Sequence, residues 1–199
     1  MQNGNRNMKR VVIVGGGAGG LVLATRLGWK LGRKKLAEII LVDSARTHVW
    51  KPLLHQLAAG SFDTHAEEIE YMAQARWNHF KFRLGNLAGI DRANKAISLA
   101  AIHDGSNDEI VPAQQLHYDI LVIAIGSHTN DFGTPGAAEH TIKLDTPEAA
   151  HRFNDRLINA TIRAQTLPPS NGNGRLTVAI VGGGATGVEL AAELHASAR

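Results

Sequence analysis

The feature that most constrains the fold is a cluster of glycines between a short apolar run and a helical pattern. Val11–Val14 is a β-branched run that ends at Gly15, and a second apolar run, Glu38–Val42, ends at Asp43. A strand, a glycine turn, a helix and a second strand make a βαβ unit, whose strands are parallel. The start of the chain therefore predicts an α/β fold with a parallel sheet. The helical pattern between the two runs rests on Leu21, Ala24, Leu27 and Leu31.

The glycine spacing, Gly15-x-Gly17-x-x-Gly20, fits a dinucleotide-binding turn. The first glycine permits the tight turn, the second lets the backbone approach a pyrophosphate, and the third lets helix and strand pack closely. Free N–H groups and the helix dipole then favour the phosphates. Asp43 lies close to the distance of about 20 residues at which an acid binds the ribose hydroxyls. We expect a dinucleotide here; the alternative is a tight strand–helix turn without a ligand.

The same pattern returns near the end of the chain. An expected strand, Val178–Val181, precedes Gly182-x-Gly184-x-x-Gly187, and an expected helix over Val188–Leu194 follows. Two such motifs favour a flavoprotein, in which one fold holds FAD and the other delivers NAD(P)H; the alternative is a pair of nucleotide-binding domains without redox chemistry. The acid that would bind the second ribose is expected about 20 residues after Gly187. That position is beyond Arg199, so these residues do not decide between NADH and NADPH.

The segments between the motifs predict further elements. We expect an FAD-binding domain over residues 1–142 and the start of an NAD-binding domain over 143–199, both incomplete, in a chain that is part of a longer protein. The expected helices are Leu53–Ala59, Thr64–Trp77 and Pro147–Ala164; the expected strands are Lys81–Leu84, a hairpin over Leu87–Leu99 that turns at Asp91–Asn94, and Asp119–Gly126; a turn is expected at Ser106–Asp108 and a linker at Pro168–Gly174.

Composition excludes several classes of protein. The chain has no cysteine, which removes disulfide scaffolds, iron–sulfur clusters and dithiol chemistry from these 199 residues. The longest apolar run, Ile120–Ile125, is far shorter than the roughly 20 residues that span a bilayer. Nucleic-acid binding is not expected, because the formal net charge is only +3 and the basic cluster is short. That cluster, which we interpret as a solvated helix end, is Lys30, Arg33, Lys34 and Lys35.

Over Lys9–Ala196 the sequence resembles bacterial type II NADH dehydrogenases, the single-subunit NADH:quinone oxidoreductases that do not pump protons. The matching stretches are VVIVGGGAGGL, LVD followed by HVWKPLLHQLAAGS, YDILVIAIGS followed by NDFGTPG, and AIVGGGATGVELAAELH. The second and fourth are specific to the family, whereas the glycine motifs alone fit any flavoprotein with two dinucleotide sites. The resemblance implies a Rossmann-like FAD/NAD(P)-binding fold with a β-hairpin insertion and a truncated second Rossmann unit.

The resemblance implies a role for each matched residue. Asp43 would bind the adenosine ribose, Lys51 would lie near the flavin and its phosphates, and Leu87 would offer backbone groups to the adenine. Ala124 and Gly126 match the apolar-Gly motif where the chain leaves the FAD domain; the superfamily often has Thr between them, and here that residue is Ile125. Gly15, Gly16, Gly17, Ala18, Gly19 and Gly20 would contact the FAD pyrophosphate, and Gly182, Gly184 and Gly187 the NADH pyrophosphate.

Glu189 and two histidines are the polar candidates near the flavin. The residue of the family that matches Glu189 points toward the flavin and nicotinamide, which implies positioning and proton handling; the alternative is a carboxylate that only benefits from the helix dipole, by about 0.3–1 kcal/mol. His48 and His55 stand beside the WKPLLH stretch, where they could approach the flavin, although structural roles are the simpler interpretation. No histidine pair has HxxxH spacing, so no metal site is expected.

The function implied is hydride transfer from NADH to FAD, followed by reduction of a membrane quinone, at an entry point of a respiratory chain. The alternatives are a soluble NAD(P)H:acceptor flavin reductase and a nucleotide-binding module without turnover. The resemblance also implies a peripheral protein at the cytoplasmic face of the inner membrane, held there through C-terminal residues absent from this chain, and a possible homodimer. The 199 residues by themselves are expected to be soluble, to bind FAD weakly or not at all and to be inactive.

Overall fold

The computed structural model describes residues 8–63, 68–166 and 176–198, and these form two compact units. The first unit contains the residues up to His48 together with Ile69–Ser127. The second contains Val49–Glu68 and the residues from His128 onward. The expected domains, divided after residue 142, were defined by the nucleotide that each would bind and not by compactness. That division stays a prediction. The linker expected at Pro168–Gly174 lies outside the described residues.

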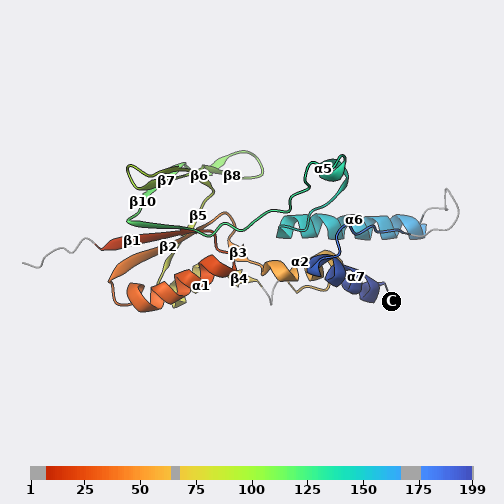
Figure 1. Ribbon diagram of the computed structural model, residues 1–199, viewed down its shortest axis with the longest axis horizontal. Helices are drawn as coiled ribbons and strands as arrows, with labels where there is room; N and C mark the ends of the chain where they lie inside the picture. Colours follow the sequence, from red (N-terminus) through yellow and green to blue (C-terminus); the bar gives the residue numbers. More distant parts are fainter. Residues whose placement is uncertain (1–7, 64–67, 167–175, 199) are drawn as a thin grey trace, which may run out of the picture. The chain divides into compact units, whose positions relative to one another are not determined.

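The first unit is built on a four-stranded parallel sheet with the order β11-β1-β2-β5 (Figure 1). Strand β1 lies in the middle and pairs in parallel with both β2 and β11, and β2 pairs in parallel with β5. The parallel sheet predicted from the βαβ pattern is therefore confirmed. The strands are β1 (Lys9–Val14), β2 (Ala37–Asp43), β5 (Lys81–Leu84) and β11 (Ile120–Ile123).

Alternate residues of the central strands serve two apolar cores. On one face, Ile13 and Ile39 pack with Ala24 of helix α1 (Ala18–Leu27) and with Tyr71 of helix α4 (Tyr71–Trp77). On the other face, Val12, Val14, Ile40 and Val42 pack against Ile97 and Leu99. Both faces are covered, which explains why these strands are continuously apolar rather than alternating.

The second face is covered by an antiparallel sheet with the order β10-β7-β6, seen above the parallel sheet in Figure 1. Strands β6 (Leu87–Asp91) and β7 (Ala96–Leu99) form a hairpin, as the sequence predicted, and Asn94 closes its turn through hydrogen bonds to the carboxylate of Asp91. Strand β10 (Gln114–His117) pairs with β7. Two short pairs complete the unit: β3 (Thr47–His48) with β4 (Ile69–Glu70), and β8 (Ile102–His103) with β9 (Glu109–Val111).

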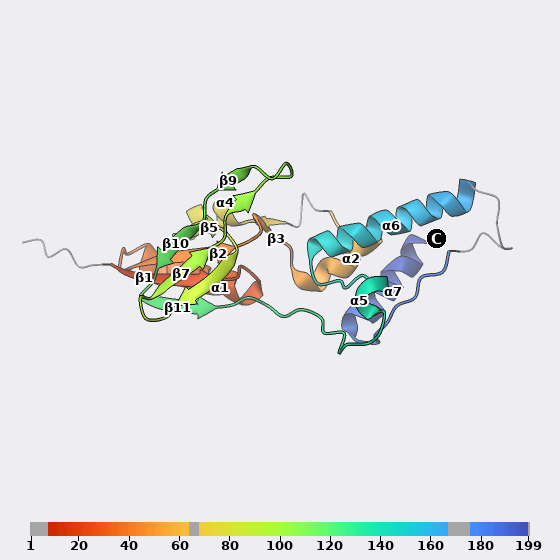
Figure 2. The same ribbon diagram turned by 90° about the horizontal axis from the view of Figure 1, so that it is seen from above.

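The second unit is helical (Figure 2). The 3₁₀ turn η2 (Lys51–Leu53) leads into α2 (Leu54–Ala59), which packs against both α6 (Pro147–Thr166) and α7 (Ala185–Ser197). Its core contains Leu54, Leu57, Ala58, Ala150 and Leu190. The helices predicted at Leu53–Ala59, Pro147–Ala164 and Val188–Leu194 are confirmed. A short helix, α5 (Ala137–His140), completes the described elements of this unit.

Two expectations about secondary structure are wrong in part, and a third is wrong. A helix was expected over Thr64–Trp77, but residues 64–67 are outside the described part and Ile69–Glu70 is strand β4. Pairing with β3 and a hydrogen bond from Tyr71 N to Arg46 O (3.1 Å) hold this segment extended until α4 begins. The strand expected at Asp119–Gly126 is only Ile120–Ile123. The expected strand Val178–Val181 is not a strand in the structure.

The helix after the first glycine turn also ends differently from the predicted pattern. Helix α1 stops at Leu27 and continues as a π-helical turn, η1 (Gly28–Gly32). The reason is close packing: a Cβ at Gly28 would overlap the carbonyl oxygen of Asn78, and one at Gly32 would overlap that of His79. The two glycines let this segment approach the backbone that leads into β5, and the helix geometry adapts to that approach.

Candidate functional site

Two of the glycines in the first turn are required by the chain itself. Gly15 follows β1 with a φ of +103°, a conformation that L side chains rarely adopt. A Cβ at Gly15 would overlap the backbone of Ala124, and one at Gly20 would overlap the carbonyl oxygen of Gly15. The Gly15 N–H also donates to Val42 O at 2.8 Å. Glycine at these two positions therefore brings helix α1 against the ends of the parallel strands.

Packing within the chain does not require glycine at positions 17 and 19. A Cβ built on either of them would meet no protein atom within 4 Å. Gly17 is the N-cap of α1 and accepts the first helical hydrogen bond, from Leu21 N at 3.0 Å, and the first turn contains no acidic side chain. The N–H groups at a helix start favour an anionic ligand. An open approach at this point is what a pyrophosphate requires of the turn, so the residues fit the group that the sequence implied.

Asp43 joins the end of β2 to the glycine turn. One carboxylate oxygen accepts a hydrogen bond from Gly16 N at 2.6 Å, and the other accepts one from Ala45 N at 2.8 Å. A carboxylate has about four acceptor sites, so these bonds orient the group and leave acceptor capacity for ribose hydroxyls. The structure therefore places Asp43 at the turn, as a ribose-binding acid requires.

Tyr71 is a residue of this site that the sequence reasoning missed. Its hydroxyl donates to Gly16 O at 2.8 Å, and the side chain is only 2% exposed. Burial, with a smaller contribution from the charge of Asp43, raises the pKa of Tyr71, so the hydroxyl remains a donor. A Cβ at Gly16 would overlap this hydroxyl. The signal was hidden because Tyr71 lies far along the chain, at the start of a helix that was predicted with the wrong boundaries.

Three further candidates lie in the first unit. Ala124 N donates to Val14 O at 2.7 Å, which sets the Ala124 backbone against Gly15, and Gly126 N donates to Ala124 O at 3.2 Å. Leu87 is the first residue of β6, just after Gly85, whose N–H donates to Asp43 O at 2.9 Å. The first glycine turn, Asp43 and Ala124 are therefore brought together at the carboxyl edge of the parallel sheet, where nucleotides bind in such folds.

The second glycine turn repeats the geometry of the first. Gly182 has a φ of +109°, a Cβ at Gly187 would overlap Gly182 O, and one at Gly184 would meet nothing within 4 Å. Gly184 is the N-cap of α7 and accepts from Val188 N at 3.1 Å. Each of the three glycines thus has the same local position within its turn as its counterpart in the first, although a Cβ at Gly182 would meet nothing within 4 Å, whereas one at Gly15 would overlap Ala124. The second turn lies in the second unit.

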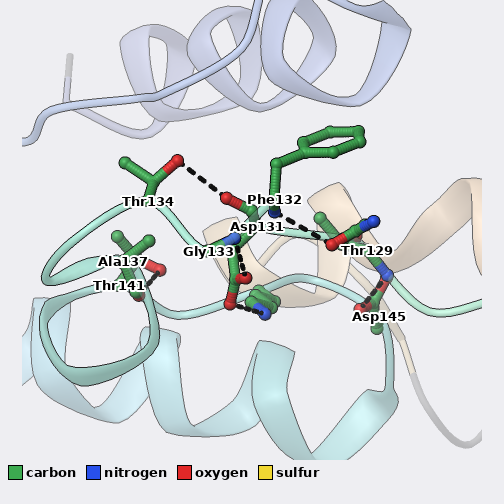
Figure 3. A network of polar contacts seen from close by, with 10 residues as sticks. Thr129, Asp131, Phe132, Gly133, Thr134, Ala137, Thr141 and Asp145 are labelled. Atoms are coloured by element: carbon green, nitrogen blue, oxygen red, sulfur yellow. Dashed lines mark hydrogen bonds and ion pairs between the residues drawn. The ribbon is translucent and has the colours of Figure 1, made fainter.

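Lys51 is held by an acid from a distant part of the sequence. Its Nζ lies 3.5 Å from Asp145 Oδ1, and both residues belong to the second unit. Figure 3 shows that Asp145 also accepts hydrogen bonds from the backbone N–H and the hydroxyl of Thr129, each at 2.7 Å. Burial raises the pKa of Asp145, but the hydrogen bonds from Thr129 and the charge of Lys51 outweigh it and lower the pKa. Asp145 is therefore a carboxylate that positions Lys51.

The same loop contains a second ion pair. Asp131 accepts from Lys143 Nζ at 2.7 Å. It also accepts from Gly133 N at 3.0 Å (Figure 3). The Lys143 contact, followed by the Gly133 hydrogen bond, lowers the pKa of Asp131. Between these groups Phe132 adopts a φ of +53° and is 87% exposed. These contacts give the segment between β11 and α6, in which the short helix α5 is the regular element, a defined conformation.

Glu189 lies in the first turns of α7 and contacts a buried histidine. Its Oε2 is 3.4 Å from His55 Nδ1; the Glu189 side chain is 50% exposed and that of His55 only 9%. His48, the other candidate histidine, lies in β3 of the first unit, and burial lowers its pKa despite the charge of Asp43. The structure therefore brings Glu189 together with His55, and Lys51 together with Asp145, within the second unit.

Neither a metal centre nor a membrane-spanning helix is found in the described part of the chain. Among residues 8–63, 68–166 and 176–198, no group of three or more His, Cys, Asp or Glu side chains is placed to hold a metal ion. Over the same residues, no helix combines the length and the apolar character that crossing a bilayer requires.

Comparison with known proteins supports the assignment of the fold. Residues 9–199 match the family described as pyridine nucleotide-disulphide oxidoreductase. A type II NADH:quinone oxidoreductase from Haemophilus influenzae is 44% identical over 206 residues, covering 96% of this chain and 46% of that protein. A demethylphylloquinone reductase from Synechocystis is 31% identical, covering 93% of this chain and 42% of that protein. The chain thus spans less than half the length of these relatives.

Solved structures agree on the fold. The structure of NDH2 from Plasmodium falciparum in complex with NADH has a TM-score of 0.75 at 23% identity, covering 93% of this chain and 36% of that chain. The sulfide:quinone oxidoreductase of Aquifex aeolicus has a TM-score of 0.59 at 23% identity, covering 77% and 32%. The Rossmann-like fold expected from the sequence is confirmed. Its two glycine turns, its parallel sheet and the match over residues 9–199 show that the chain belongs to the pyridine nucleotide-disulphide oxidoreductase family.

Proposed function

We propose that the complete protein is an FAD-dependent NADH:quinone oxidoreductase. The observation that carries the proposal is the pair of glycine turns with matching geometry, in a chain that is 44% identical to a type II NADH:quinone oxidoreductase. Bound FAD would accept a hydride from NADH and then reduce the quinone; this chemistry belongs to the cofactor, while the protein binds and orients. No cysteine is present in the chain, so no dithiol takes part from these residues.

The first glycine turn is the proposed FAD site. Gly17 and Gly19 leave the backbone open to the pyrophosphate, and the N–H groups at the start of α1 bind its oxygens. Asp43, oriented by Gly16 N and Ala45 N, binds the adenosine ribose. The backbone of Leu87 would contact the adenine, and Ala124 and Gly126 would line the exit from the sheet. The residues proposed for the pyrophosphate are Gly15, Gly16, Gly17, Ala18, Gly19 and Gly20.

The second turn, with Gly182, Gly184 and Gly187, is the proposed NADH site. This proposal is supported by Gly184, where, as at Gly17, a Cβ would meet no protein atom within 4 Å, so that a ligand can approach the backbone. Glu189 follows on the same helix and is half exposed, so its carboxylate is available to position the nicotinamide and to handle a proton near the flavin. Lys51 would lie near the flavin and its phosphates, where its ammonium group balances their negative charge. The domain division at residue 142 belongs to the same proposal.

The setting of the complete protein is also a proposal. The relatives are named as quinone reductases, and respiratory quinones are lipid-soluble. We therefore infer that the complete protein acts at a membrane as a peripheral protein. From the family resemblance alone we propose that it lies at the cytoplasmic face of the inner membrane and forms a homodimer. Fractionation of cells that express it, with a salt wash of the membranes, tests the attachment, and light scattering of the purified protein tests the dimer.

The experiment that tests the function uses the complete protein. It should purify yellow with a flavin absorption band, lose that band when NADH is added without oxygen, and regain it when a quinone analogue follows. If ferricyanide or oxygen restores the flavin band but the quinone analogue does not, the soluble reductase is favoured. Colourless protein that takes up no FAD would falsify the proposal and favour a nucleotide-binding module.

A further inference from the structure

His55 stands out as a polar side chain inside an apolar cluster. It lies on α2 between Leu54 and Leu57, and it is 8% exposed. Apart from Tyr71, whose hydroxyl is hydrogen-bonded, it is the one polar or charged residue that is buried within residues 8–63, 68–166 and 176–198. Buried polar groups normally have hydrogen-bond partners. In the same described residues, His55 Nδ1 is buried without one.

Among the described residues, Glu189 is the one acid whose carboxylate lies within ion-pair distance of that nitrogen. Glu189 Oε2 lies 3.4 Å away, within ion-pair distance but without hydrogen-bond geometry. On the same face of α7, Glu193 accepts from the hydroxyl of Ser61 at 3.0 Å, so its carboxylate has another partner. One turn before His55, Lys51 pairs with Asp145. The titratable side chains of α6 are all exposed: Glu148, His151, Arg152, Asp155, Arg156 and Arg163.

A small rotation of Glu189 would convert this contact into a hydrogen bond. The Glu189 side chain is half exposed, so it is not fixed by packing. His55 is held by the packing of α2 against α6 and α7. A rigid donor beside an adjustable acceptor selects one rotamer of the acceptor, and a hydrogen bond to a charged group is among the stronger ones. The carboxylate would then stand in a fixed position in the first turns of the helix that follows the second glycine turn.

We propose that His55 is a positioning residue, which donates from Nδ1 to the carboxylate of Glu189 and so sets its place relative to the bound nicotinamide. This inference deepens the proposed function and rests on it for the role of Glu189. It assigns a task to a histidine for which the sequence favoured a structural role. The pairing itself is a physical contact that can be tested without turnover.

The first test is nitrogen NMR of the complete, flavin-loaded protein labelled at histidine. The His55 signal is identified by its loss in H55L. We expect the Nδ1 resonance to shift in E189Q and to stay in place in E193Q, the matched change one turn further along α7. An Nδ1 signal that is unmoved by E189Q overturns the pairing, whatever the enzyme does.

The second test is kinetic and uses H55L, H55N and E189Q. H55L should lower kcat about tenfold, the size expected for losing a charge-assisted hydrogen bond, with the KM for NADH unchanged. H55N should restore most of the rate, because its side-chain NH₂ stands near the position of Nδ1. The double variant H55L/E189Q should be no slower than E189Q, since coupled residues are not additive. S61A is the control and should keep the parent rate.

Two outcomes of the kinetic test overturn the inference. One is a double variant whose loss equals the product of the single losses, which shows independent action. The other is an H55N protein as slow as H55L, which shows that the donor at the Nδ1 position is not what matters. Failure of the proposed function is seen separately, as a parent protein that has no flavin or that does not respond to NADH.

Discussion

The two glycine turns have the same local geometry in different surroundings. Gly15 and Gly182 have φ values of +103° and +109°, and Gly20 and Gly187 each approach the carbonyl oxygen of the first glycine of their own turn. The first turn follows a strand that is paired on both sides. The second follows Val178–Val181, which forms no strand. The turn is therefore determined locally by its glycines, whereas a strand depends on partners.

The segment before the second turn shows why partners matter. Val181 is 89% exposed, while Val14, at the matching place before the first turn, is 4% exposed. Backbone N–H and C=O groups of a strand need a neighbouring chain to form the ladder. Within the described residues no strand pairs with Val178–Val181. The same kind of sequence therefore forms a strand in one place and an unpaired extended segment in the other.

The largest expected effect tests whether the two turns are truly equivalent. In the complete protein, Gly20→Val and Gly187→Val each push a side chain into a carbonyl oxygen. Each should lower the free energy of unfolding of its own domain by about 3 kcal/mol. Urea denaturation followed by circular dichroism measures this. Gly89→Val, on β6, where a Cβ would meet nothing within 4 Å, is the control. If Gly187→Val is as stable as its parent, the second glycine turn is not equivalent to the first.

The next effect separates the two ligands. Gly17→Val should abolish FAD binding while keeping the protein folded, because a side chain there meets no protein atom within 4 Å but would meet the pyrophosphate. Gly184→Val should keep its flavin and raise the KM for NADH at least about tenfold, a loss of roughly 1.4 kcal/mol of binding. Flavin absorbance and steady-state kinetics measure the two. Normal flavin content in Gly17→Val would refute the assignment of the first site.

A smaller effect concerns the support of the first turn by Tyr71. Tyr71→Phe removes the hydroxyl that donates to Gly16 O at 2.8 Å and leaves that carbonyl without this donor. The expected cost is about 1 kcal/mol of unfolding free energy, with weaker retention of FAD. Thermal unfolding and FAD titration of the complete protein check it. Tyr118→Phe is a matched control. If Tyr71→Phe has the same stability and FAD affinity as Tyr118→Phe, the glycines alone fix the turn.

The smallest effect is a pH dependence at the opposite end of the sheet. Glu38 on β2 accepts from Arg10 Nε on β1 at 2.6 Å and from Lys81 Nζ on β5 at 2.5 Å. The Lys81 and Arg10 contacts outweigh burial and lower the pKa of Glu38 from its ordinary value. The resulting stability is present above the unfolded-state pKa and is lost as pH falls through the lower, folded-state value.

Because Lys81 is largely exposed and Arg10 partly exposed, this contribution should be at most about 1 kcal/mol. Urea midpoints of the complete protein, measured between neutral pH and pH 3, should fall more for the parent than for Glu38→Gln. Equal slopes for the two proteins would show that the contacts of Glu38 do not contribute.

Much of the fold was predictable because its signals are local. The glycine spacing, the apolar runs at β1 and β2, the hairpin turn at Asp91–Asn94 and the helical period of α6 each act over a few residues. The wrong boundaries come from long-range contacts. Ile69–Glu70 is extended because β3 pairs with it, and α1 changes into a π-helical turn because Gly28 and Gly32 meet the backbone of Asn78 and His79.

The candidate site divides in the same way. Its glycines and Asp43 follow from motif spacing, and the second turn was placed as accurately as the first. Tyr71 and Asp145 have no motif. Tyr71 contacts the first glycine turn in the first unit, and Asp145 contacts Lys51 in the second unit, each across a long separation in sequence. The pairing of His55 with Glu189 also joins residues far apart in the sequence, and nothing in the spacing indicated it.

The sequence by itself determined the two glycine turns, the parallel sheet and the family, because glycine conformations and apolar periodicity are properties of short segments. Only the tertiary structure decided which apolar run becomes a strand and which polar groups meet, because ladders and buried contacts need partners from elsewhere in the chain. Those partners place Tyr71 under the first turn, Asp145 beside Lys51 and His55 beside Glu189.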